Sequence, residues 1–301
     1  MGTTLDAFQL ARTKLGLDEL VDESLPTIYQ PVADWVAASH ALAGGCVVIG
    51  VNGAQGSGKS TFCALLKPVL EELHQLKVAV LSIDDVYHTR ETRLRLSKDI
   101  HPLCQIRGVP GTHDVQLAMQ TIDALSASHE HSHVAIPRFN KASDDRKPAD
   151  HWDVAEGAID VILFEGWCVG CPPMADWTEP YNTREAREDP DGTWAQWSIS
   201  RLEAEYRRLF ARLDGLIMIK VPSMETVRMS RWLQEKALRE TLGVTQDVDE
   251  QHVGLMTQAQ VFDYVALFER ATEHMLASLP KTADVLIERD DTFRYCLDRI
   301  P

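Results

Sequence analysis

The chain has 301 residues, and its 30 basic and 45 acidic side chains give a formal net charge of −15. With 45% hydrophobic and 25% charged residues it has globular proportions, which exclude collagen, low-complexity disorder and coiled coil. The length suffices for a hydrophobic core in one large domain. A protein this acidic repels nucleic acid and anionic membrane, so we expect neither as a partner, and protein partners stay unknown.

The cysteine and hydropathy patterns indicate a reducing, aqueous compartment. The six cysteines show no framework spacing, and no stretch approaches the ~20 apolar residues of a membrane span. Residues 1–6 (MGTTLD) lack the basic and apolar regions of a secretory leader. We therefore expect a cytoplasmic protein.

The predicted elements alternate between strands and helices from residue 46 onward. Residues 3–43 are predicted to be helical, and residues 46–51 (CVVIGV) form an apolar run typical of a buried parallel strand. In chain order there follow a helix to Leu73, a strand at 78–83, helices at about 89–98 and 113–127, a short strand at 133–137, polar irregular residues at 139–153 and a strand at 158–164.

The second half of the chain continues this alternation after an interruption. Residues 170–193 contain four prolines and are predicted to form a long surface loop. Then come a helix at about 195–212, a strand at 215–221, a helix from Pro222 to about 241, a helix at 257–278 and a strand at 283–288. This order predicts the α/β class: a doubly wound parallel sheet with helices on both faces and helical additions.

The strongest motif is a phosphate-binding loop that matches G-x-x-x-x-G-K-S/T between the first strand and the helix after it. Its residues are Gly53, Ala54, Gln55, Gly56, Ser57, Gly58, Lys59, Ser60 and Thr61. Glycines let backbone N–H groups wrap the phosphates of ATP, Lys59 reaches the β- and γ-phosphates, and the Ser60 hydroxyl ligates Mg²⁺. The loop predicts a P-loop NTPase fold and leaves the phosphoryl acceptor open.

Acidic residues follow two of the predicted strands. Asp84 and Asp85 end the strand at 78–83, and Glu165 ends the strand at 158–164. The carboxyl ends of parallel strands meet at the edge where ligands bind, beside the phosphate loop. There one carboxylate of the pair can accept the proton of an attacking hydroxyl and the other can hold a Mg²⁺-bound water, while Glu165 is a candidate metal group.

These motifs resemble those of a known group of kinases. The succession of a phosphate loop, residues 82–87 (SIDDVY) and residues 164–166 (FEG) is similar to that of the group holding uridine kinase, phosphoribulokinase and bacterial pantothenate kinase. Residues 107–114 (RGVPGTHD) resemble the R-G-x-x-G-S/T-H-D segment of D-glycerate 3-kinases. Residues 136–142 (IPRFNKA) resemble a further segment of that family, and residues 232–235 (WLQE) resemble its W-R-x-Q-x-E stretch. The resemblance spans about residues 46–290.

The resemblance implies roles for individual residues. Asp84 aligns with the acceptor-activating Asp of the wider group and also counts with Ser60 and Glu165 as a metal candidate, with Asp85 as the reserve base. Arg231 is implied as a lid arginine that neutralises the transferring phosphoryl group. The candidates for binding the acceptor are Tyr87, Arg107, His113, Asp114, Lys141 and Arg146, with Arg107 best suited to a carboxylate.

We therefore expect one P-loop kinase domain over residues 1–301, with an N-terminal helical extension at 1–43, a loop insertion at 170–193 and a lid region at 222–241. The expected reaction is ATP- and Mg²⁺-dependent phosphorylation of the small molecule D-glycerate to 3-phosphoglycerate. Two alternatives stay open: a kinase for another small acceptor, such as a nucleoside or pantothenate, and a P-loop assembly ATPase or switch.

Two further patterns are weaker. Residues 129–133 (HEHSH) match the H-E-x-x-H of zinc proteases, but that site needs a helix and the sequence predicts a loop before a strand. Cys168 and Cys171 form a lone C-x-x-C that is followed by two prolines and has no second pair to complete a zinc site. We expect neither pattern to carry the function.

Overall fold

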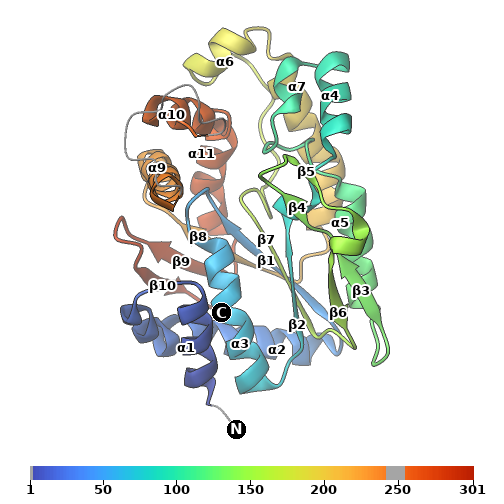
Figure 1. The fold of residues 1–301 in the computed structure, drawn as a ribbon, viewed down its shortest axis with the longest axis vertical. Helices are drawn as coiled ribbons and strands as arrows, with labels where there is room; N and C mark the ends of the chain where they lie inside the picture. Colours follow the sequence, from blue (N-terminus) through green and yellow to red (C-terminus); the bar gives the residue numbers. More distant parts are fainter. Residues whose placement is uncertain (1–2, 242–254) are drawn as a thin grey trace.

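The computed structural model describes residues 3–241 and 255–301, which build on a six-stranded central sheet with the order β10-β9-β8-β1-β7-β2 (Figure 1). The strands are β1 (Val47–Gly53), β2 (Val78–Ser82), β7 (Val161–Gly166), β8 (Gly215–Lys220), β9 (Val285–Arg289) and β10 (Tyr295–Arg299). All neighbouring pairs are parallel except β9 and β10. The α/β class and the parallel sheet are therefore confirmed, and the antiparallel β10 was not predicted.

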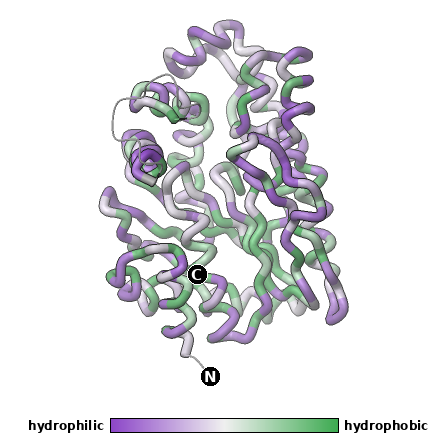
Figure 2. The backbone as a smooth tube through the Cα atoms, in the orientation of Figure 1, coloured by the Kyte–Doolittle hydropathy of each residue, from purple (hydrophilic) through white to green (hydrophobic). Residues whose placement is uncertain are grey.

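The inner strands form where the sequence is continuously apolar. Every residue of β1 and β7 is buried, and their register pairs Val47 with Val161 and Val51 with Glu165. A strand that is covered on both faces by helices has no solvent-facing side, which is why these runs do not alternate with polar residues. In Figure 2 the central strands are coloured as hydrophobic and lie in the interior of the molecule.

Helices cover both faces of the sheet (Figure 1). One core packs α1 (Thr4–Lys14), α2 (Gln30–Ala43) and α3 (Lys59–His74) against the sheet. The other face carries α5 (Val115–Ser126), α7 (Thr193–Arg201), α8 (Arg207–Phe210) and α11 (Glu269–Ser278). At the carboxyl edge of the sheet, α9 (Met224–Thr241) packs against α10 (Gln258–Ala266), and α4 (Arg90–Asp99) lies across from them.

Residues 133–156 differ from the sequence prediction. The short strand predicted at 133–137 is β3 (His133–Ile136), and it pairs antiparallel with β6 (Asp153–Glu156) outside the central sheet. The stretch 139–153, predicted to be irregular, contains β4 (Phe139–Asn140) and β5 (Asp145–Arg146), which form a second small hairpin. The strands β4 and β5 are too short and too polar to produce a periodic hydrophobic pattern in the sequence.

Two helical predictions and one loop prediction also need correction. The helix predicted at 195–212 is α7 and α8 joined by a π-helical stretch at Leu202–Tyr206, and the helix at 257–278 is divided into α10 and α11. The loop predicted at 170–193 contains a short helix, α6 (Thr183–Glu188), whose N-cap Asn182 accepts from two backbone N–H groups. In the described part of the chain no helix is long and apolar enough to cross a membrane.

Candidate active site

The phosphate loop lies between β1 and α3, as predicted. Gly56 and Gly58 have φ of +74° and +90°, a region that favours glycine because it has no Cβ. The N–H of Ser57 donates to the Ala54 carbonyl at 3.0 Å, and Lys59 is the first residue of α3. The N–H groups at the start of α3 have no partner within the helix, so they can bind the phosphates of a nucleotide.

Ser60 and Glu165 meet beside this loop. The Ser60 hydroxyl donates to Oε1 of Glu165 at 2.9 Å, because β7 lies next to β1 and brings its last residues level with the loop. Glu165 is 4% exposed, and its Oε2 has no hydrogen-bond partner among the described residues. A hydroxyl and a carboxylate oxygen with free capacity are the oxygen donors that suit a hard divalent cation such as Mg²⁺.

The Asp84 carboxylate is held by two donors. Asp84 lies in a short 3-10 turn, Ile83–Val86, directly after β2. The Tyr87 hydroxyl donates to its Oδ1 at 2.9 Å and the Lys141 ammonium to its Oδ2 at 2.7 Å. Burial acts to raise the pKa of Asp84, but the charges of Lys141 and Lys59 outweigh it and lower the pKa below its usual range. Asp84 is therefore an ionised carboxylate facing the phosphate loop.

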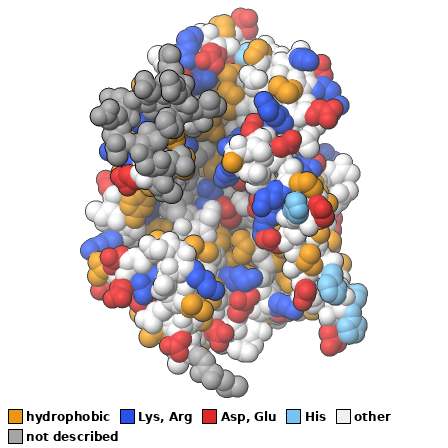
Figure 3. Space-filling view, in the orientation of Figure 1, with side chains coloured by type: hydrophobic (Ala, Val, Ile, Leu, Met, Phe, Trp, Pro, Cys, Tyr) orange, Lys and Arg blue, Asp and Glu red, His pale blue; other side chains and the backbone are white. Residues whose placement is uncertain are grey.

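A cavity of about 340 Å³ joins the loop to Asp84. The space-filling view shows the molecule hollowed here, with basic side chains facing into the hollow (Figure 3). The predicted site residues among its lining are Gln55, Gly56, Lys59, Ser60, Asp84, Tyr87, Arg107, Lys141 and Arg231. The structure thus brings together residues from five separate segments of the sequence, with cationic groups around one carboxylate.

Arg107 reaches the cavity from a turn that requires glycine. At Gly108, where φ is +145°, a Cβ would lie 2.3 Å from the Phe268 ring. The Trp167 indole N–H donates to the Gly108 carbonyl at 2.8 Å, and the Gly108 N–H donates to the Thr112 hydroxyl at 3.0 Å. These contacts fix the backbone that carries Arg107, which is why glycine follows the arginine in the motif.

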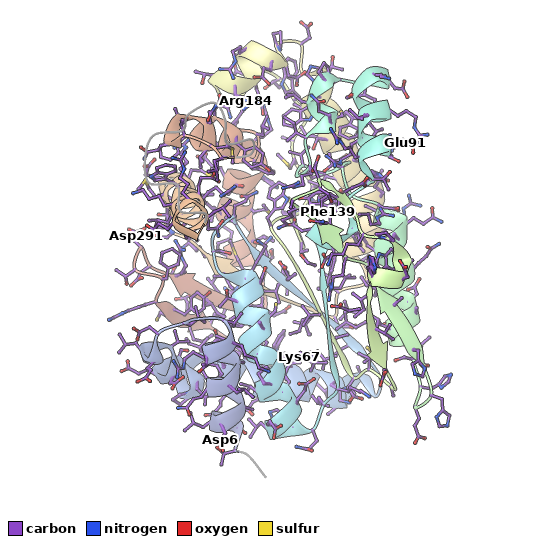
Figure 4. All side chains as sticks on the ribbon, viewed as in Figure 1. Asp6, Lys67, Glu91, Phe139, Arg184 and Asp291 are labelled. Carbon is purple, nitrogen blue, oxygen red and sulfur yellow. The ribbon has the colours of Figure 1, made fainter. Side chains whose placement is uncertain are left out.

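The Arg107 side chain is held by neighbours on the small hairpins. Its Nη1 donates to Oδ1 of Asp144 at 2.5 Å, and its guanidinium carbon lies 5.7 Å from the centre of the Phe139 ring. Phe139 is labelled in Figure 4, where it lies on β4 at the middle of the molecule. A guanidinium has five N–H donors, so these contacts leave others free to bind an anion.

Arg231 lies on α9, the helix of the predicted lid region. Its Nη2 lies 3.3 Å from Oε2 of Glu235, one helical turn further on, and Glu235 is buried. The preceding residue, Ser230, packs against the phosphate loop, since a Cβ at Gly56 would lie 2.5 Å from the Ser230 Cβ. This contact places Arg231 at the cavity and next to the loop.

The reserve base, Asp85, does not line the cavity. Its carboxylate accepts from Nη1 of Arg138 at 2.7 Å and from the Phe139 N–H at 3.0 Å. Burial raises the pKa of Asp85 although these two donors act to lower it. The role of Asp85 in this geometry is therefore structural. Its two hydrogen bonds connect the β4–β5 hairpin to the turn after β2.

His113, Asp114 and Arg146 lie behind Tyr87 and also do not line the cavity. The His113 ring stacks on the Tyr87 ring with 4.4 Å between centres, and its Nδ1 bonds to the Tyr206 hydroxyl at 2.6 Å. Asp114 caps α5 by accepting from the Leu117 N–H at 3.0 Å, and its Oδ2 pairs with Arg146 at 3.1 Å. Burial lowers the pKa of His113 to about 3, so its ring is neutral.

Sequence reasoning missed several cavity residues, namely Trp167, Gln234, Tyr264 and Phe268. Trp167 directly follows the F-E-G motif and Gln234 lies in the W-L-Q-E stretch, so motif adjacency could have indicated both. Tyr264 and Phe268 are spaced four residues apart, which is also the spacing of ordinary core residues on a helix, so no signal separated them from packing.

The two weaker motifs carry no site in the described residues. His129 and Glu130 lie in a turn and His133 begins β3, so the helix that a zinc protease needs is absent there. Among residues 3–241 and 255–301, no group of three or more His, Cys, Asp or Glu side chains could hold a metal ion. Cys168 and Cys171 are buried free thiols, and burial raises the pKa of Cys171 to about 12.

Comparisons with known proteins find kinases among the sequence relatives of this chain. No family model matches the chain. It is 30% identical over 200 residues to "Uncharacterized kinase mug58" of Schizosaccharomyces pombe, a match covering 64% of this chain and 71% of that protein. It is 32% identical over 201 residues to the chloroplastic D-glycerate 3-kinase of Arabidopsis thaliana, which covers 64% of this chain and 42% of that protein.

A solved structure extends the likeness over most of the chain. The D-glycerate 3-kinase from Cryptococcus neoformans superposes with a TM-score of 0.69, covering 90% of this chain and 99% of that one. At 21% identity this likeness shows the P-loop kinase fold. The sequence relatives lead to one conclusion: the chain belongs to the D-glycerate 3-kinase family of ATP-dependent P-loop kinases.

Proposed function

We propose that this kinase transfers the γ-phosphoryl group of Mg·ATP to the C3 hydroxyl of D-glycerate. One observation carries the proposal: Asp84, ionised and held by Tyr87 and Lys141, shares a cavity with the phosphate-loop residue Lys59 and with Arg107. D-glycerate is a small carboxylate with two hydroxyls, so it needs a cationic group for its carboxylate and an acceptor for a hydroxyl proton. The Arabidopsis thaliana relative is named D-glycerate 3-kinase and supports this acceptor, whereas the Schizosaccharomyces pombe relative is named only as a kinase and supports phosphoryl transfer.

The nucleotide would be bound by the phosphate loop. Backbone N–H groups of the loop and of the start of α3 surround the β-phosphate, and Lys59 reaches the γ-phosphate. Ser60 and Glu165 would hold Mg²⁺, whose charge neutralises the phosphate oxygens when it is bound. The free Oε2 of Glu165 supports this assignment, because it is a buried carboxylate oxygen that lacks a protein partner among the described residues.

The acceptor would lie between Asp84 and Arg107. Arg107 binds the carboxylate through the N–H groups that Asp144 leaves free, and Asp84 accepts the proton of the attacking hydroxyl. The hydroxyl oxygen bonds to the γ-phosphorus while the bond to the β–γ bridging oxygen breaks, giving ADP and 3-phosphoglycerate. Lys59 and Arg231 stabilise the charge on the transferring group, so catalysis is mainly positioning and electrostatics.

The proposal is tested by ADP release from Mg·ATP with D-glycerate, L-glycerate, uridine, pantothenate or no acceptor, with the product identified by NMR. We expect ADP release with D-glycerate alone and a phosphate on C3. Release with another acceptor would discard the substrate but keep the kinase chemistry, and release regardless of acceptor would favour an assembly ATPase or switch. Lys59→Ala, purified in parallel, should lose turnover and so controls for contaminating kinases.

A further inference from the structure

A fully buried arginine lies on the side of the phosphate loop away from Asp84. Arg289 is the last residue of β9 and is 1% exposed. Among the described residues, no carboxylate lies within ion-pair distance of its guanidinium, although such groups are rarely buried without one. Burial lowers its pKa, but an arginine starts so high that it stays charged. A buried charge of this kind is costly, so its contacts need an explanation.

The guanidinium of Arg289 connects the phosphate loop to α9. Its Nη1 donates to the carbonyl oxygen of Gly56 at 2.8 Å, and its Nη2 donates to the Ser230 hydroxyl at 3.1 Å. The guanidinium carbon lies 4.3 Å from the centre of the Phe293 ring, which covers its face. One planar group therefore bonds two elements that are far apart in the sequence, and the ring fixes its plane.

The same two elements also touch directly. Gly56 has φ of +74°, and a Cβ there would lie 2.5 Å from the Ser230 Cβ, so loop and helix are in van der Waals contact. Ser230 is 4% exposed. Because contact and hydrogen bonds act at the same point, the separation between the loop and α9 is set there. The next residue along α9 is Arg231, which faces the cavity that Lys59 lines.

We propose that Arg289 is a positioning residue that clamps α9 onto the phosphate loop and thereby sets Arg231 against the transferring phosphoryl group. This rests on the catalytic role proposed for Arg231 but not on glycerate being the acceptor. Arg289 does not itself line the acceptor cavity, and Gly56 is the cavity residue to which it donates. Its route to Arg231 runs through the Ser230 hydroxyl on α9. Without the clamp, the folded protein keeps Arg231 but loses its fixed distance from the loop.

A double-mutant cycle tests the proposal with the variants Arg289→Met, Arg231→Ala and both together. Methionine keeps an unbranched apolar stem and removes the guanidinium donors. Turnover is measured with whichever acceptor the wild-type enzyme uses, or as basal ATP hydrolysis if it uses none, so a wrong acceptor does not affect the test. We expect Arg289→Met to lower kcat about tenfold or more in the wild-type background and less than about threefold when Arg231 is already absent.

Matched variants separate positioning from folding. Arg294→Met removes an exposed arginine from the neighbouring turn and should leave kcat unchanged. Arg289→Lys should restore part of kcat, because one ammonium can reach one of the two oxygen acceptors. If Arg289→Met does not fold, Ser230→Ala removes the acceptor on α9 alone and should lower kcat a few-fold, again only when Arg231 is present.

Equal losses of kcat with and without Arg231, in either Arg289→Met or Ser230→Ala, would overturn the proposal. Such additivity would mean that the arginine stabilises the loop without placing the lid residue. A rise in KM for ATP with kcat unchanged would also overturn it, since that pattern belongs to nucleotide binding.

Discussion

The ammonium of Lys141 donates to Oδ2 of Asp84 at 2.7 Å and joins two segments that are 57 residues apart in the sequence. The pair explains why a half-buried carboxylate beside the phosphate loop is ionised: burial alone would raise its pKa, and Lys141 together with Lys59 reverses the effect. Each oxygen of Asp84 has a donor, Tyr87 at Oδ1 and Lys141 at Oδ2. Lys141 therefore both keeps Asp84 ionised and helps to fix the position of its carboxylate.

Asp84→Asn should show that Asp84, and not the neighbouring Asp85, is the general base. The amide keeps the shape but cannot take a proton, so kcat should fall by about 10²–10⁴, the usual contribution of a general base, with nucleotide affinity little changed. Asp85→Asn is the matched control, because Asp85 bonds Arg138 and the Phe139 N–H and does not line the cavity. It should lower thermal stability more than kcat. Turnover of Asp84→Asn near the wild-type value would remove Asp84 from the base role.

Lys141→Met should make the protonation of Asp84 visible in the pH profile of kcat/KM. With Lys141 removed, Lys59 is left to oppose the effect of burial on the pKa of Asp84. That pKa should therefore rise toward or above its usual range. Asp84 acts only when ionised, so the acid limb of kcat/KM should move to higher pH than in the wild-type enzyme. Profiles that extend down to about pH 4, the usual pKa of an aspartate, check this, and an acid limb that does not shift over that range would contradict the coupling.

The parts of the site that sequence could predict are those with a local signal. Residues 46–51 are apolar without interruption because β1 is covered on both faces, and the loop after them must contain glycines to wrap phosphate. The strand β10 gave no such signal, since it is an edge strand that alternates between partly buried and exposed residues. Its antiparallel pairing with β9 is decided by tertiary packing.

Other features depend on contacts between distant residues. Asp84 and Asp85 are equivalent in sequence, and only the position of Arg138 and the Phe139 N–H decides that Asp85 faces away from the cavity. His113 was predicted to bind the acceptor, yet it stacks behind Tyr87 because residues 86–88 pair with residues 112–114. No spacing rule within one segment reports which of two neighbouring polar residues turns inward.

Glu165→Gln should weaken the use of Mg²⁺. Glutamine can still accept the hydrogen bond from Ser60, but it removes the negative charge from the buried oxygen that has no partner among the described residues. The Mg²⁺ concentration for half-maximal activity should rise about tenfold or more, the scale of losing a metal-site carboxylate partner. Glu71→Gln, on the exposed side of α3, is the charge-matched control. Equal Mg²⁺ dependence in both variants would contradict the assignment.

Arg107→Gln should raise KM for D-glycerate and leave KM for ATP nearly unchanged. The substitution removes charge-assisted hydrogen bonds to a carboxylate, each worth about 1.5–3 kcal/mol, so the effect should be about tenfold or more. Asp144→Asn keeps Arg107 but weakens its bond at Oδ1, so it should raise the same KM by less. If Arg107→Gln raises KM for ATP instead, the arginine binds the nucleotide and not the acceptor.

His113 should make the protein less stable as the pH falls. Burial lowers the pKa of its ring to about 3 from an unfolded value near 6.5, so below pH 6.5 the unfolded chain binds a proton that the folded one does not. The free energy of unfolding then decreases with falling pH by up to about 1.4 kcal/mol per unit for this one proton. His113→Asn keeps a polar group for the Tyr206 hydroxyl and removes the titration. Chemical denaturation at pH 5.0 to 7.5 should give a shallower pH slope for His113→Asn than for the wild-type protein, and identical slopes would show that His113 is free to take up a proton in the folded state.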